Sequence, residues 1–293
     1  MIPEIEYRRP STVKEALEYL KDSQGQVKLI AGGTDIIPGI QQNSKRFSDI
    51  KILIDTKSIN DLKKIEFEGN ELTIGSACTF SDILSNPMIK DKYPLLIKAA
   101  SSLGSVQIRN LATITGNFVN NAPCADSVPP LLVYDAKIKI ESLDEQRITA
   151  LEDFLVKPYT NQLETHEMIT EIILPSPPEK MKGDFYKLGR RRAVSISRIT
   201  LAVLVQMENE TIEELRIASG AITPIGKRFY ELENYIKNKP VTADFLKMIA
   251  QQLGEQILQA TGLRWSSPYK LPVVQQLFYQ ILTDLCLCRE GQK

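Results

Sequence analysis

Residues 113–126 read T-I-T-G-N-F-V-N-N-A-P-C-A-D, combining one glycine, three asparagines and one aspartate with small and hydroxyl residues. A solvated surface loop usually carries more charge than this. Neutral donors and acceptors of this kind suit a polar ligand such as a ribityl chain and a pyrophosphate. A buried loop whose asparagines satisfy one another is the alternative. We expect a polar loop over about residues 104 to 126.

A second candidate loop lies near the start of the chain, where residues 29–35 read L-I-A-G-G-T-D. The apolar run V-K-L-I-A predicts a strand that ends at Gly32 and Gly33, followed by a half-turn of helix and a second strand, K-I-L-I-D. Glycine lets a main chain approach a phosphate closely. By itself, however, this pattern equally fits a structural turn with a helix cap.

The usual glycine motifs of nucleotide-binding proteins are missing from the sequence. No two glycines are separated by one residue, which excludes the G-x-G-x-x-G pattern of a Rossmann domain. Gly220 and Gly226 precede Lys227, but this spacing is one residue too long for a Walker motif, and Arg228 replaces its Ser or Thr. These absences disfavour a phosphate-transfer enzyme.

Composition limits the other classes of function. The 293 residues carry 36 basic and 36 acidic side chains, which disfavours nucleic acid or an anionic membrane as a partner. The start, M-I-P-E-I-E-Y-R-R-P, lacks the pattern of a signal peptide, so we expect a cytoplasmic protein without membrane insertion.

The possible metal ligands are few. Cys78, Cys124, Cys286 and Cys288 form no C-x-x-C pair, and the last two should face different sides of a terminal helix. The single histidine, His166, lies in a polar E-T-H-E segment that is typical of a solvated turn. We expect neither a metal site nor a histidine-based catalyst on this chain.

The remaining patterns predict an α+β organisation. Residues 12–21 and 93–104 have helical periodicity, whereas K-K-I-E-F with E-L-T-I-G, and K-I-K-I-E-S with Q-R-I-T-A-L, read as strand pairs. M-I-T-E-I-I-L-P, at residues 168–175, should be a strand. The proline-rich P-S-P-P-E-K-M-K-G at 175–183 predicts a domain boundary near residue 180. Beyond it we expect three strands and three helices, the last with a buried stripe formed by Leu271, Val274, Phe278, Ile281 and Leu285.

Taken together, the segments at 29–35 and 107–136 closely resemble the FAD-binding medium subunits of molybdenum hydroxylases, the xanthine dehydrogenase and carbon monoxide dehydrogenase flavoprotein family. The resemblance covers essentially the whole chain and includes F-Y-K-L-G-R-R-R-A-V-S-I-S at 185–197. It implies an FAD-binding domain of the vanillyl-alcohol-oxidase (PCMH) type over residues 1–178, with subdomains of about 1–58 and 59–178. An α+β C-terminal domain with a small antiparallel sheet and helices would follow over 179–293.

The resemblance also implies which residues bind FAD. The first pyrophosphate loop would comprise Lys28, Leu29, Ile30, Ala31, Gly32, Gly33, Thr34 and Asp35, and the second Ala112, Thr113, Ile114, Thr115, Gly116 and Asn117. Asn120 and Asp126 would complete the polar cradle, and the residues beside the flavin ring would be Leu103, Gly104, Met168, Ile169, Tyr186 and Lys187. Thr115 departs from the family, which usually has glycine there. If that position requires a positive φ, threonine costs on the order of 1 kcal/mol.

The implied role is that of an electron relay. In the family, a large subunit carries the molybdopterin cofactor, and a small subunit carries the 2Fe–2S clusters that deliver electrons to this FAD. NAD+ would be the usual acceptor, and the assembly a dimer of heterotrimers. This role assigns no acid–base catalyst to the chain. The alternatives are a free-standing FAD-dependent oxidoreductase of the same fold and a scaffold subunit that has lost its flavin.

Overall fold

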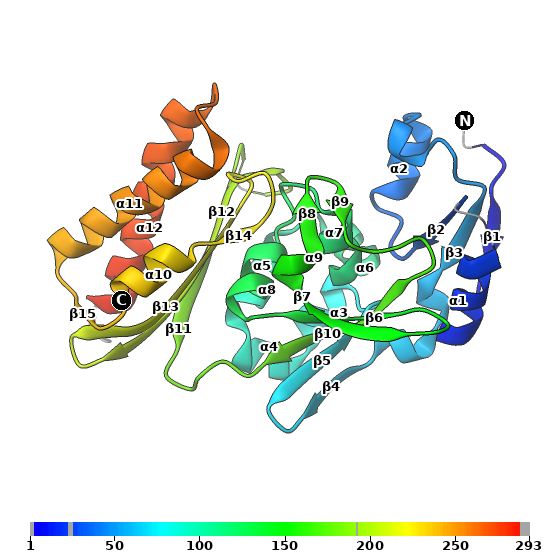
Figure 1. Cartoon of the computed structure of the whole chain (residues 1–293), viewed down its shortest axis with the longest axis horizontal. Helices are drawn as coiled ribbons and strands as arrows, with labels where there is room; N and C mark the ends of the chain where they lie inside the picture. Colours follow the sequence, from blue (N-terminus) through cyan, green and yellow to red (C-terminus); the bar gives the residue numbers. More distant parts are fainter. Residues whose placement is uncertain (1–2, 23–25, 192, 288–293) are drawn as a thin grey trace. The chain divides into compact units, whose positions relative to one another are not determined.

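The computed structural model describes residues 3–22, 26–191 and 193–287 (Figure 1). Contacts between residues divide the chain into two compact units. Unit 1 comprises Met1–Asn86, Leu103–Asn121 and Asp135–Ser176, and unit 2 comprises Pro87–Ser102, Ala122–Tyr134 and Pro177–Lys293. Each unit therefore contains segments that are distant in sequence. The domain limits expected from the sequence stay a prediction.

Unit 1 begins with a small parallel sheet in the order β1 (Glu6–Arg8), β3 (Ile52–Asp55), β2 (Val27–Ile30). Helix α1 (Val13–Asp22) packs Ala16, Leu17 and Leu20 into a core with Ile54. It starts where the sequence predicted, because the Thr12 hydroxyl accepts a hydrogen bond from the amide of Glu15 at 3.2 Å. After β2 come α2 (Ile36–Gln41) and the 3-10 turn η1 (Lys45–Phe47).

The larger sheet of unit 1 has the order β4-β5-β10-β6-β7, and all its neighbours are antiparallel. Its strands are β4 (Ile65–Glu68), β5 (Glu71–Gly75), β10 (Met168–Pro175), β6 (Lys137–Glu141) and β7 (Gln146–Ala150). The two predicted strand pairs and the predicted strand at 168–175 are thus confirmed. Helix α9 (Leu151–Phe154) then leads into a small hairpin formed by β8 (Leu155–Lys157) and β9 (Thr160–Asn161).

The prediction of a continuous polar loop over residues 104–126 was wrong. This stretch contains α6 (Val106–Leu111) and α7 (Ile114–Asn120). Each helix has a side-chain cap, since the Ser105 hydroxyl accepts from the amide of Ile108 and the Thr113 hydroxyl accepts from the amide of Gly116. These helices are too short and too polar to show an apolar period, so the pattern resembles that of a loop.

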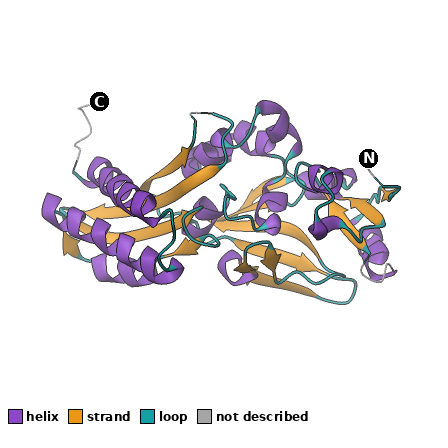
Figure 2. Ribbon diagram, turned by 90° about the horizontal axis from the view of Figure 1, so that it is seen from above, coloured by secondary structure: helices purple, strands orange, loops and turns teal. Residues whose placement is uncertain are grey.

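Unit 2 is built on an antiparallel sheet of β11 (Lys182–Gly189), β12 (Ser197–Glu208), β13 (Thr211–Gly220) and β14 (Lys227–Arg228), with β15 (Lys239–Pro240) beside β13. Figure 2 shows long helices beside these strands. They include α11 (Ala243–Thr261) and α12 (Ser267–Cys286), which follow α10 (Tyr230–Ile236) and share a core with Leu201 and Val203. The predicted strands and helices are confirmed, and in the predicted stripe of the last helix Val274, Phe278 and Ile281 are buried while Leu271 and Leu285 are partly buried against the same core.

Three further helices belong to unit 2, namely α4 (Pro87–Lys92), α5 (Pro94–Ser102) and α8 (Val128–Val133). The predicted helix at 93–104 is confirmed as α5. A Cβ built on Gly183 of β11 would meet both Leu95 of α5 and Leu204 of β12, and one on Gly220 would meet Pro129 of α8. Side chains alternate along β12, so α5 and α8 cover the face opposite to the one that bears Leu201 and Val203.

Candidate functional site

The first predicted loop is divided between a strand and a turn. Lys28, Leu29 and Ile30 belong to β2, and the turn itself comprises residues 31–35. Gly33 has a φ of +69°, which a side chain would strain. The amides of Gly32, Gly33 and Thr34 donate no hydrogen bond to any described residue. The turn therefore offers several main-chain donors to a ligand.

The turn touches the second predicted segment directly. A Cβ built on Gly32 would lie 2.1 Å from the carbonyl oxygen of Leu111 and 2.7 Å from the Cα of Ala112. Glycine at position 32 is therefore required by this contact between two parts of the protein. The structure brings the two glycine-containing segments together, as a shared binding site requires.

The second segment is anchored by its own backbone. Phe80, at the start of α3 (Phe80–Ser85), donates its amide to the Ala112 carbonyl at 3.0 Å, and Ile114 donates to Cys78 at 3.2 Å. Thr115 lies in the first turn of α7 and is absent from the residues with positive φ. The expected steric penalty therefore does not arise. The Thr115 hydroxyl is buried and forms no hydrogen bond with any described residue.

The asparagines in α7 and at its end have separate roles. Gly116 is exposed, and Asn117 is half-buried. Asn120 accepts a hydrogen bond from the guanidinium of Arg46, a residue that the sequence analysis did not select. Asn121 has a left-handed backbone, and its Nδ2 donates to the carbonyls of Lys157 and Thr160 at 2.9 and 2.8 Å. Asn121 thus fastens the end of α7 to the β8–β9 hairpin.

Leu103 and Gly104 form a turn that Arg109 stabilises. The Nη1 atom of Arg109 donates to the carbonyl of Leu103 at 2.9 Å and to that of Gly104 at 3.1 Å. Gly104 has a φ of +49°, and a Cβ there would lie 2.9 Å from the Ile108 side chain. Arg109 is a second residue that sequence reasoning missed. The only feature of the sequence that indicates Arg109 is a basic residue five positions after Gly104.

Met168 and Ile169 are both buried at the start of β10, the central strand of the larger sheet. The Met168 side chain packs in the core with Ala16, Leu17 and Ile54. Other side chains of the protein therefore fill the space around Met168. The backbone of this strand end, where the register with β6 shifts between Ile169 and Glu171, is the part that a ligand could contact.

In unit 2 the structure brings two of the predicted residues together. Lys187 of β11 donates to Asp126 at 2.6 Å and to the carbonyl of Ser102 at 3.0 Å, while the Ser197 hydroxyl donates to the other carboxylate oxygen of Asp126. Burial raises the pKa of the Asp126 carboxyl, and the Lys187 charge and both hydrogen bonds oppose that rise. Tyr186, the neighbour of Lys187, is 42% exposed.

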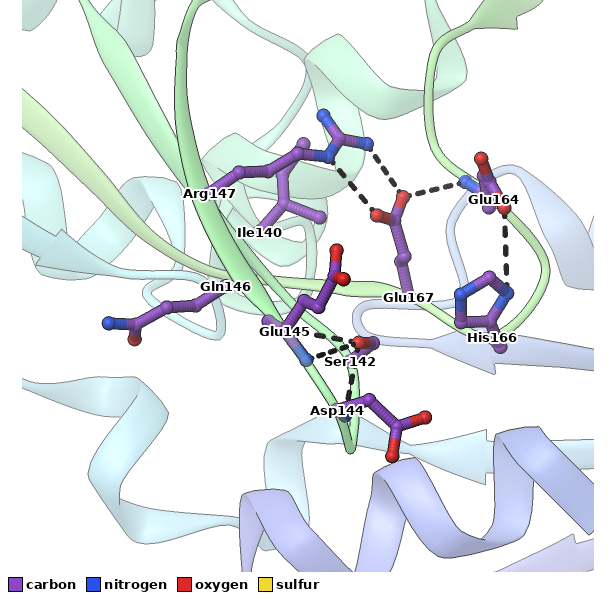
Figure 3. A pocket seen from close by; sticks show the side chains of 9 residues that line it. All are labelled: Ile140, Ser142, Asp144, Glu145, Gln146, Arg147, Glu164, His166 and Glu167. Atoms are coloured by element: carbon purple, nitrogen blue, oxygen red, sulfur yellow. Dashed lines mark hydrogen bonds and ion pairs between the residues drawn. The ribbon is translucent and has the colours of Figure 1, made fainter.

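A polar hollow elsewhere in unit 1 contains none of the predicted site residues (Figure 3). It lies at the β6–β7 turn and is lined by Asp144, Glu145, Glu164 and His166 among others, with Arg147 paired to Glu167 at 2.7 Å. Within the described ranges, no group of three or more His, Cys, Asp or Glu side chains could hold a metal ion. Of the other charged side chains in the hollow, His166 lies 3.6 Å from Glu164, and Asp144 pairs with Lys21 outside it.

The cysteines do not form a cluster in the part of the chain that is described. Cys78, Cys124 and Cys286 are not in disulfide bonds, and burial raises the pKa of the Cys78 thiol to about 12 and that of Cys286 to about 11. Cys288, and with it the expected orientation relative to Cys286, lies outside the described residues. In the same ranges, no helix is both long enough and apolar enough to cross a membrane.

Comparison with known proteins identifies the family. Residues 3–177 match the model of the FAD binding domain in molybdopterin dehydrogenase, and residues 184–285 match that of the CO dehydrogenase flavoprotein C-terminal domain. The chain belongs to the FAD-binding subunits of molybdenum hydroxylases. This is a family of oxidoreductase subunits, as the resemblance implied.

Similarity to individual members of the flavoprotein family extends along the whole chain. A putative xanthine dehydrogenase FAD-binding subunit of Escherichia coli (strain K12) is 31% identical, with 98% of this chain and 97% of that protein covered. The nicotinate dehydrogenase FAD-subunit of Eubacterium barkeri is 30% identical, with 98% of each covered. The solved structure of carbon monoxide dehydrogenase from Hydrogenophaga pseudoflava covers 97% of each chain at 26% identity with a TM-score of 0.89. The expected α+β flavoprotein fold is confirmed.

The residues of unit 1 fit the flavin cofactor of this family. The unpaired amides of Gly32, Gly33 and Thr34 are suitable donors for a pyrophosphate, whose oxygens accept hydrogen bonds. The buried hydroxyl of Thr115 lacks a partner among the described residues, and a buried polar group normally has one. Both observations are explained if a polar ligand occupies the place where these segments meet.

Proposed function

We propose that this chain is the flavin-holding relay of a molybdenum hydroxylase. It would receive single electrons from 2Fe–2S clusters of a small partner subunit and pass them in pairs to NAD+ or another acceptor. The observation that carries the proposal is the contact between the Gly32 turn and the Leu111–Ala112 segment, beside amides that donate to none of the described residues. Bound FAD would supply the exchange between single electrons and electron pairs.

The residues of the chain would bind and orient this cofactor. In unit 1, the turn at 31–35 and the start of α7 would hold the pyrophosphate through neutral donors, and Arg109 would fix the Leu103–Gly104 turn beside the ring. In unit 2, Lys187 would present a fixed positive charge whose position is set by Asp126 and the Ser102 carbonyl. The proposal assigns no proton-transfer step to any residue.

The proposal places the molybdopterin cofactor on a large subunit and the clusters on a small one, in a dimer of heterotrimers. The carbon monoxide dehydrogenase relative is described as a medium chain. Two apolar side chains between α11 and α12 also suit contact with a partner, since Leu263 is 83% exposed and Trp265 is 86% exposed. Cys78, Cys124 and Cys286 form no disulfide bond in the described part of the chain, which suits the reducing conditions of the cytoplasm. We keep the domain limit near residue 178, between the two matched ranges, as part of the proposal.

The decisive experiment compares the isolated chain with the chain co-expressed with the products of its neighbouring genes. We expect the isolated chain to carry FAD after desalting and to be reduced by NADH under anaerobic conditions. It should oxidise no heterocycle or aldehyde. The co-expressed chain should copurify with molybdenum and iron, and that complex should reduce NAD+ with an organic substrate.

Three outcomes would contradict parts of this proposal. A chain that retains no flavin would favour the scaffold alternative. Oxidation of an organic substrate by the isolated chain would favour the free-standing oxidoreductase. NADH could fail to reduce the bound flavin while the complex rapidly reduces another acceptor. This result would remove NAD+ from the proposed pathway, but the chain would keep its proposed role as an electron relay.

A further inference from the structure

Arg46 connects three segments of unit 1 that lie far apart in sequence. Its Nη2 lies 3.3 Å from Asp35 Oδ2 in the first glycine turn and donates to Asn120 Oδ1 at the end of α7. Its guanidinium lies 4.3 Å from the ring centroid of Tyr159, at the tip of the β8–β9 hairpin, and 4.8 Å from that of Phe47. The cation is thus held in one orientation by two rings and two acceptors.

The contacts of Arg46 leave part of its guanidinium unused. A guanidinium has five N–H donors in a planar fork. All the side-chain hydrogen bonds that Arg46 makes to described residues use Nη2, so the hydrogens on Nε and Nη1 have no protein acceptor. The Arg46 side chain is 37% exposed. It therefore has both free donors and access for a ligand.

The negative charge of Asp35 explains why a cation is needed beside the first glycine turn. Asp35 follows directly after the unpaired amides of Gly32, Gly33 and Thr34, and its carboxylate is 51% exposed. An unpaired carboxylate beside this turn would repel the negative charges of a pyrophosphate. Arg46 neutralises Asp35 and still presents its remaining N–H groups. Arginine commonly binds phosphate oxygens through two parallel hydrogen bonds.

We propose that Arg46 is a binding residue for the pyrophosphate of FAD and compensates the charge of Asp35 at the first glycine turn. This inference rests on the proposed function. It adds a cationic residue to a site otherwise built from neutral donors. The Tyr159 and Phe47 rings hold the guanidinium plane, so that little side-chain entropy is lost on binding.

The test uses the full-length chain freed of flavin, and compares wild type with Arg46→Ala, Arg46→Gln and Arg46→Lys. The matched control is Lys45→Ala, which removes the same charge from the adjacent, exposed residue of η1. Calorimetric titrations with FAD, riboflavin, ADP and adenosine separate the contribution of the pyrophosphate. Each FAD titration is repeated at low and high KCl, and circular dichroism checks that every variant is folded.

We expect Arg46→Ala and Arg46→Gln to weaken binding of FAD and ADP by about ten-fold or more, which is typical for the loss of a charge-assisted hydrogen bond. Riboflavin and adenosine, which lack the pyrophosphate, should bind as they do to wild type. The dependence of FAD affinity on KCl should become shallower. Arg46→Lys should recover part of the affinity, and Lys45→Ala should behave as wild type.

Two results would overturn the role of Arg46 and leave the proposed function intact. One is wild-type affinity and salt dependence for FAD in Arg46→Ala. The other is an equal loss of FAD and riboflavin binding in the folded variant, which would mean that Arg46 only supports the structure. If wild type binds neither FAD nor ADP, the proposed function and the role of Arg46 both fail.

Discussion

The carbonyl oxygen of Leu111 lies where Gly32 leaves no room for a side chain, because a Cβ at position 32 would be only 2.1 Å from it. Gly32 lies in the turn after β2, and Leu111 ends α6, so this contact joins the two glycine-containing segments. The A-G-G-T-D motif therefore combines two requirements. Gly32 permits the two segments to meet, and Gly33 adopts the positive φ that turns the chain toward α2.

The first prediction concerns Gly32→Ala. The added methyl group must push the turn and the Leu111 carbonyl apart, which we expect to cost about 1–3 kcal/mol in the free energy of unfolding. Because the two segments then separate, FAD should be lost on desalting. Urea unfolding and the ratio of flavin to protein measure these two effects.

The control for this substitution is Gly69→Ala, in the turn between β4 and β5. Gly69 has a φ of +58°, but a Cβ there would meet nothing within 4 Å. This variant should lose on the order of 1 kcal/mol through backbone strain and keep its full flavin content. Full flavin retention in Gly32→Ala would show that the contact of these segments does not form the binding site.

The parts of the site that could be predicted from the sequence are those where local pattern and chemistry coincide. Paired glycines after an apolar strand, and asparagines without charged neighbours, pointed to the turn at 31–35 and to α7. Arg46 could not be found this way, because its partner Asn120 lies 74 residues away and an exposed cation has no distinctive pattern. The pairing of Lys187 with Asp126, 61 residues apart, likewise depends on how β11 folds onto the preceding segment.

Two further features could not be read from the sequence, for similar physical reasons. The helices α6 and α7 are short and capped by Ser105 and Thr113, so their sequences lack the apolar repeat that identifies longer helices. Met168 matches a family position, but a pattern does not tell which face of β10 its side chain occupies. The structure buries that side chain in the core with Ala16 and Ile54.

The second prediction concerns Thr115, whose hydroxyl is buried without a partner in the described residues. If FAD accepts a hydrogen bond from this hydroxyl, Thr115→Val should weaken FAD binding by about five- to ten-fold, since such a bond contributes on the order of 1 kcal/mol. The flavin-free variant should be as stable as wild type or more so, because an unsatisfied buried hydroxyl is removed.

Thr115→Ser keeps the hydroxyl and is the matched control, with an expected affinity close to that of wild type. Fluorescence titration of the flavin-free chain measures the affinities, and thermal unfolding without flavin measures stability. Equal FAD affinity of Thr115→Val and wild type would mean that the hydroxyl does not contact the cofactor.

The third prediction uses the buried pair of Lys187 and Asp126. In Lys187→Met, the carboxyl loses the charge and hydrogen bond that oppose the effect of burial, so its pKa should rise further above the ordinary value of 3.8. The folded state then binds a proton that the unfolded state has released. Stability should therefore fall as pH rises from about 3.8 to the raised pKa of the folded chain, and remain constant above it.

Urea unfolding of Lys187→Met between pH 4 and pH 8 tests the sign of this effect. At pH 8 the uncompensated buried carboxylate should cost about 3–5 kcal/mol relative to wild type. Adding Asp126→Asn to Lys187→Met removes the titrating group, so the double variant should lose this pH dependence and recover stability at pH 8. Equal destabilisation of Lys187→Met at pH 4 and at pH 8 would mean that Asp126 does not retain its charge in a buried environment. The fixed positive charge assigned to Lys187 would then require another partner.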